Sequence, residues 1–205
     1  MSEFLTRIHP NWAELLSFFV SVALLQNVIL TTGFGSSVMI HMVKKPKSIW
    51  LFSGILAFFS VLTVVIAYPL DQRFGTDMNN LWRPFMMVSI TVVLYVATTL
   101  LLKWLLPNLY SRIGRLLPMA AFNNLVTGIA LVCNAHFGTN LAGNVGLAIG
   151  SCLSFGILTW LTAEGMERMD NPDMPEAFRG MPSTLLYVGL LALALMGFVA
   201  NSPLI

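Results

Sequence analysis

The sequence predicts an all-α polytopic membrane protein, because charges are scarce and apolar residues come in long stretches. Of the 205 residues, 57% are hydrophobic and only 10% are charged, against about 25% charged in an average globular domain. The mean hydropathy is +0.79. So few charges cannot coat a soluble domain of this size, which excludes a cytosolic enzyme, a disordered protein and a nucleic-acid-binding protein.

Six apolar stretches are each long enough to cross a bilayer, which takes roughly 20 residues. They run over about Glu14–Ile40, Ile49–Leu70, Pro84–Leu105, Leu116–Cys133, Leu141–Thr162 and Met181–Ala200. The first lacks a signal-peptide cleavage site, so we expect it to be retained as a span. All five tryptophans fall near a predicted span end, where indole rings prefer to lie. The short connections predict one six-span domain over 1–205.

The distribution of basic residues predicts the orientation. The connections after the first, third and fifth spans hold Lys44, Lys45, Lys47, Lys103, Arg112, Arg115, Arg168 and Arg179. The other face holds Arg7, Arg73 and Arg83. The positive-inside rule then puts both termini on the outer side of the membrane. We expect the arm Met1–Trp12 to lie along that outer surface, because its apolar residues recur at helical spacing.

Two short matches predict an internal repeat. Leu25–Leu30 resembles Phe122–Thr127, which lies 97 residues later in the sequence. At almost the same offset, Trp82-Arg83 resembles Phe178-Arg179. The copies would cover about 13–106 and about 115–201. Three spans per copy force the two copies into opposite orientations, which is the inverted-repeat architecture of many transport proteins. Chance similarity between two short apolar segments is the alternative.

Polar side chains enter the membrane in the first span of each copy. This predicted polar centre consists of Gln26, Asn27, Thr31, Thr32, Asn123 and Asn124. Carboxamides at this depth are costly without partners. Together with the neighbouring glycines, they predict that spans one and four are interrupted near Thr31–Ser37 and Asn123–Gly128. Such interruptions form binding sites in inverted-repeat proteins. The alternative is that the amides are interhelical packing contacts.

Three stretches carry a family resemblance: Leu24–Gly35 (LLQNVILTTGFG), Leu117–Gly128 (LPMAAFNNLVTG) and Ala177–Phe198 (AFRGMPSTLLYVGLLALALMGF). They resemble the six-span subunits RnfA, RnfE, NqrD and NqrE of the Rnf and Na⁺-translocating NADH:quinone reductase complexes, most of all the RnfA/NqrE branch. The resemblance implies a membrane subunit that pairs with a sister six-span subunit. It also implies flavin and iron–sulfur partner subunits, and a [2Fe–2S] cluster that the two sister subunits hold near mid-membrane.

The chain departs from that family where the cluster would be bound. Each family member supplies two cysteines, and the aligned positions here are Ser37 and Asn124. Neither residue is a good cluster ligand. Cys133 lies nine residues beyond Asn124, about 13 Å along a helix, and Cys152 lies in the fifth span. We therefore expect no cofactor to be bound by this chain alone, with [2Fe–2S] or flavin in its partners.

Three function classes follow. The leading hypothesis is a non-catalytic membrane subunit of an Rnf/Nqr-like electron-transport complex, supporting electron transfer and ion translocation in the inner membrane. The second is a small inverted-repeat transporter or channel for a polar solute or ion. The third is a purely structural scaffold. The three histidines lack metal-binding spacing and no carboxylate lies in mid-membrane, so we expect no metal site and no acid-based relay.

Overall fold

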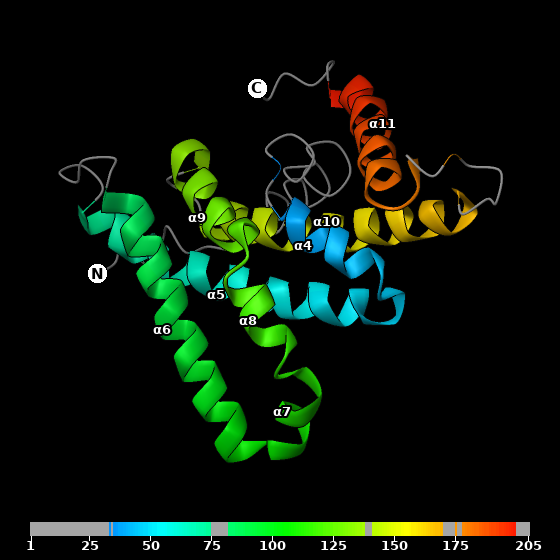
Figure 1. Ribbon diagram of the computed structural model, residues 1–205. Coiled ribbons are helices and arrows are strands. Elements are labelled where there is room, and N and C mark those ends of the chain that lie inside the picture. Colours follow the sequence, from blue (N-terminus) through cyan, green and yellow to red (C-terminus); the bar gives the residue numbers. More distant parts are fainter. Residues whose placement is uncertain are drawn as a thin grey trace.

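The computed structural model describes residues 33, 35–74, 82–137, 141–169, 175 and 178–199 (Figure 1). Within these ranges the chain forms helices and no strand. The helices are α4 (Ser36–Val43), η2 (Pro46–Ser48), α5 (Ile49–Phe74), α6 (Trp82–Leu105), α7 (Pro107–Ile113), α8 (Leu116–Ala121), α9 (Asn124–Phe137), α10 (Leu141–Met169) and α11 (Met181–Val199).

The helices confirm the all-α polytopic membrane class. Four segments among the described residues are long and apolar enough to cross a membrane: Pro46–Leu70, Trp82–Leu105, Leu116–Cys133 and Leu141–Met169. Met181–Ala194 is a shorter apolar helical segment. The first predicted span up to residue 32 and the arm Met1–Trp12 lie outside the described residues, so the count of six spans stays a prediction.

Helices α5 and α9 end beyond their predicted spans, at Phe74 and Phe137, and α10 extends the furthest. α10 continues to Met169, seven residues beyond the predicted end at Thr162. These added turns are polar, and Arg168 Nη2 lies 3.1 Å from Glu164 Oε1, one turn apart. The drop in hydropathy after Thr162 therefore does not end the helix, which continues through exposed polar residues.

The centre of the molecule is an antiparallel pair of helices, α5 and α10 (Figure 1). The rings of Phe52 and Phe155 lie 5.6 Å apart, and further along α5 the Cys152 thiol donates to Ser60 Oγ at 3.4 Å. The Ser53 hydroxyl also donates to the Cys152 carbonyl at 2.6 Å. The two helices therefore run antiparallel, as is expected for the second and fifth spans of an up-and-down bundle.

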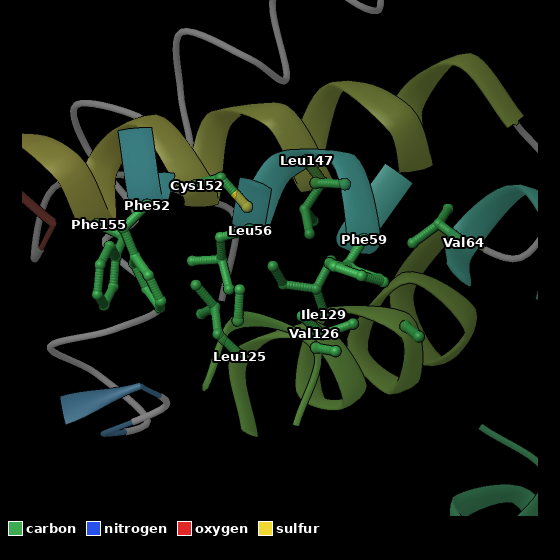
Figure 2. Packing of buried hydrophobic residues seen from close by; sticks show 14 of the residues in the cluster. Phe52, Leu56, Phe59, Val64, Leu125, Val126, Ile129, Leu147, Cys152 and Phe155 are labelled. Atoms are coloured by element: carbon green, nitrogen blue, oxygen red, sulfur yellow. The ribbon is translucent and has the colours of Figure 1, made fainter. Parts of the chain in front are cut away.

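Helix α9 packs against this central pair (Figure 2). Its residues Leu125, Val126 and Ile129 are buried and point toward Leu56 and Phe59 of α5. Because lipid tails are as apolar as these side chains, the contact is stabilised by close packing more than by removal from water. The core thus fixes where α9 begins, and with it one of the two helix interruptions described below.

The central helices share a buried polar pattern. Ser53, Ser60 and Thr63 on α5 recur at i, i+7 and i+10, and each is at most 6% exposed. On α10, Asn144, Ser151 and Ser154 have the same spacing and are at most 1% exposed. Each residue lies 91 positions after its counterpart. A stripe with this spacing runs along one side of a helix, so both helices carry a comparable polar side inside the bundle.

Candidate interrupted-helix site

Two segments form the candidate site: the glycines directly before α4 and the break between α8 and α9. Gly33 and Gly35 have φ values of 72° and 80°, and α4 begins directly after them at Ser36. In the fourth span, α8 ends at Ala121 and α9 begins at Asn124, with Phe122 and Asn123 between them. The structure thus shows a break inside the fourth predicted span and non-helical glycines directly before α4, while the part of the first predicted span before Gly33 lies outside the described residues.

Both helices α4 and α9 begin inside the segments predicted to be interrupted. The expected range Thr31–Ser37 includes Ser36 and Ser37, which are already helical, and α9 is helical throughout 124–128. The physical reason in the second break is a cap. Asn123 Oδ1 accepts a hydrogen bond from the Leu125 N–H at 3.1 Å. Asparagine is among the preferred N-cap residues, because its side chain satisfies a backbone donor that the helix leaves unpaired.

The two breaks meet in space. A Cβ on Gly35 would lie 3.3 Å from Asn123 Oδ1, 3.5 Å from Leu125 Cβ and 3.4 Å from Phe155 Cε2. Glycine is favoured here for two reasons: the backbone is left-handed, and a side chain would crowd Asn123 and Phe155. Phe155 places α10 directly behind the junction. We call Gly35, Ser36, Ser37, Asn123 and Asn124 the break junction.

Ser37 and Asn124, aligned with the family's cysteines, occupy similar places beside these breaks. Ser37 is the second residue of α4 and Asn124 the first of α9, and both side chains are exposed. Asn123, in contrast, is buried, and its Nδ2 has no hydrogen-bond partner in the part of the chain that the structure describes. The junction therefore has one buried amide and two polar side chains on its surface.

The structure brings together only part of the predicted polar centre. Asn123 and Asn124 lie at the junction. Gln26, Asn27, Thr31 and Thr32 lie outside the described residues. The two helices restart at Ser36 and Asn124, 88 residues apart, whereas residues 97 beyond Gly33 and Gly35 are helical inside α9. The observed breaks therefore do not follow the 97-residue register of the sequence match.

The cysteines lie away from the junction. Cys133 is buried in α9, where its thiol donates to the Asn144 carbonyl at 3.6 Å. Cys152 is buried in α10 and bonded to Ser60. No group of three or more His, Cys, Asp or Glu gathers among the described residues. The hydroxyl and amides at the junction do not fit an iron–sulfur cluster, which requires thiolate or imidazole ligands.

Sequence reasoning missed buried polar atoms on α5 and α10. The side-chain oxygens of Thr63, Ser151 and Ser154, and both amide atoms of Asn144, are buried without a hydrogen-bond partner among the described residues. Such atoms are costly in a membrane unless water or another group reaches them. The i, i+7, i+10 spacing that the two helices share is the signal that the sequence offers for them.

The chain is similar to known proteins over nearly its whole length. The family model described as "Rnf-Nqr subunit, membrane protein" matches residues 15–201. The A-type subunit of the ion-translocating oxidoreductase complex of Pasteurella multocida is 30% identical over 188 residues, covering 90% of this chain and 96% of that protein. The proteins of the same name from Azoarcus sp. and Escherichia coli O1:K1 / APEC are 30% and 26% identical, each matched over 96% of its length and over 91% and 90% of this chain, respectively. This chain therefore belongs to the Rnf-Nqr family of membrane subunits.

Proposed function

We propose that this chain is an integral membrane subunit of an Rnf-type ion-translocating oxidoreductase complex and supports electron transfer across the membrane. The observation that carries the proposal is the break junction, found in a chain that matches the family over residues 15–201. The matched relatives are named as subunits of an oxidoreductase complex, which favours this function over an independent transporter or channel.

The proposed partners are flavin- or iron–sulfur-containing subunits together with a sister six-span subunit. Ser37 and Asn124 are exposed beside the junction, so this surface is open to a neighbouring protein. Neither residue supplies a thiolate, and both cysteines are buried elsewhere. In this proposal the chain contributes the scaffold, while partner subunits bind any cluster and carry the redox chemistry.

The proposed placement is the inner membrane, with both termini outside and two inverted repeats over about 13–106 and about 115–201. The buried polar spacing common to α5 and α10 favours a repeat, although its offset of 91 residues differs from the 97 residues of the sequence match. A cavity lined by Lys44, Glu164 and Arg179 joins the basic connections after the first and fifth spans at one end, and the positive-inside rule assigns that end to the cytoplasm.

The direct test is purification of the tagged, full-length chain with its native membrane neighbours. We expect flavin- and iron–sulfur-containing subunits to co-purify, and a reducible [2Fe–2S] signal in electron paramagnetic resonance to persist in Cys133→Ala and Cys152→Ala. Loss of that signal in either variant would show that this chain binds the cluster. If no redox subunit co-purifies and reconstituted vesicles take up a solute without one, the transporter hypothesis replaces this proposal.

A further inference from the structure

A mixed-charge cavity of about 610 Å³ opens at the end of the bundle where α4 ends, α10 ends and α11 begins. Its polar lining includes Lys44, Glu164, Glu167, Arg179 and Thr184. Its apolar lining includes Ile40, Val43, Trp160, Met166 and Met181. The cavity lies apart from the break junction and shares none of its residues.

The cavity sits where a membrane surface would be. Trp160 is 46% exposed and lies two residues before the predicted end of the fifth span. Glu164 and Glu167 follow just beyond that end, in the polar turns of α10. Exposed tryptophan beside charged residues is typical of the headgroup level of a bilayer. A ligand here can therefore place a polar group in the cavity and an apolar chain against Ile40, Val43 and Met181.

The two signs of charge come from different elements. Glu164 and Glu167 lie on one side of α10, and the Thr184 hydroxyl of α11 already donates to the Gly180 carbonyl at 3.1 Å. These groups offer oxygen acceptors. Lys44, at the end of α4, and Arg179, just before α11, offer donors. Glu164 is already paired with Arg168 at 3.1 Å, so an anion alone would face the Glu167 carboxylate, and a cation alone would face Lys44 and Arg179.

We propose that this cavity binds the headgroup of a zwitterionic phospholipid with a primary ammonium group, such as phosphatidylethanolamine. The ammonium lies against the acceptors of Glu164, Glu167 and Thr184, and the phosphate lies against Lys44 and Arg179. An acyl chain follows the apolar lining. Anionic phospholipids bind less well, because they lack the ammonium group that offsets the Glu167 carboxylate. This assignment does not depend on the proposed redox function.

The test uses the full chain, purified with its membrane partners from vesicles of equal phosphatidylethanolamine and phosphatidylglycerol, with bound lipids counted by native mass spectrometry. We expect phosphatidylethanolamine to be retained in excess. Glu167→Gln should shift the ratio toward phosphatidylglycerol by roughly three- to fivefold, as loss of one partly exposed ion pair allows. Lys44→Gln should weaken retention of both lipids.

Matched variants keep the result interpretable. Lys47 is an exposed basic residue that does not line the cavity, so Lys47→Gln should leave the lipid ratio unchanged. Glu164→Gln tests the same acceptor side if Glu167→Gln lowers the yield. Soluble phosphoethanolamine that displaces the lipid at millimolar concentration would show that the headgroup suffices for binding. Equal retention of both lipids by the wild type, or an unchanged ratio in both glutamate variants, would overturn the proposal.

Discussion

Gly35 lies beside Asn123 where the segment before α4 approaches the start of α9, and a Cβ on Gly35 would lie only 3.3 Å from Asn123 Oδ1. The same oxygen accepts the Leu125 N–H at the start of α9. The Asn123 side chain thus caps the start of α9 and also lies next to Gly35. The geometry of the break junction therefore depends on glycine at position 35 and on the short polar side chain of Asn123.

Gly35→Ala should destabilise the protein more than Gly33→Ala. Both glycines have positive φ, so each substitution carries a backbone cost of roughly 1–2 kcal/mol. Only at Gly35 does the new methyl group also press on Asn123 and Phe155, whereas nothing lies within 4 Å of a Cβ on Gly33. Thermal unfolding in detergent measures the difference. Equal melting temperatures for the two variants would contradict the close approach.

Asn123→Ala should lower the free energy of unfolding by about 0.5–2 kcal/mol, the usual cost of losing an N-cap. Its Oδ1 accepts a hydrogen bond from the Leu125 N–H at 3.1 Å. The alanine side chain has no acceptor to replace that oxygen. Asn123→Ser keeps a side-chain acceptor and should recover most of the loss. Denaturant or thermal unfolding of the three proteins checks this. A serine variant no better than alanine would argue against a cap.

Gly165→Ala should separate α11 from α10. A Cβ on Gly165 would overlap the ring of Tyr187 and would lie only 2.6 Å from the Tyr187 hydroxyl oxygen. Gly189→Ala is the matched control, because it lies in α11 with nothing within 4 Å of the added methyl group. We expect the control to be neutral or slightly stabilising. A double-cysteine distance measurement between the two helices, together with melting temperatures, distinguishes the variants.

Ser53→Ala should weaken the contact between α5 and α10 by about 0.6 kcal/mol, the average for a hydrogen bond between membrane helices. The Ser53 hydroxyl donates to the Cys152 carbonyl at 2.6 Å. Ser89→Ala removes a hydroxyl that bonds only within its own helix, to the Phe85 carbonyl at 2.8 Å, and should have a smaller effect. If both serine variants unfold alike, the interhelical bond contributes nothing measurable.

Maleimide labelling should separate the native cysteines from the junction. Cys133 and Cys152 are buried and should react slowly in the folded protein, because the reagent needs an accessible thiol. Ser37→Cys places a thiol at an exposed position and should react much faster. Mass spectrometry after short exposure gives the rates. Rapid labelling of either native cysteine would show that the bundle opens around it.

The sequence determined the helices, because hydropathy and charge report directly on what a bilayer accepts. The predicted starts of the second, third and fifth spans lie within two residues of the starts of α5, α6 and α10. The family also followed from local motifs around Asn123 and Ala177–Phe198. Even the break in the fourth span was predictable, because clustered amides are costly in an apolar helix unless protein shelters them.

Only the tertiary structure decided how these parts meet. The contact of Gly35 with Asn123 joins residues 88 apart, and nothing in the local pattern measures that distance. The buried polar atoms of Thr63 and Asn144 look like ordinary span residues until packing encloses them. Burial and close approach depend on several helices at once. Local sequence therefore determines which segments enter the membrane, whereas packing determines which atoms share a site.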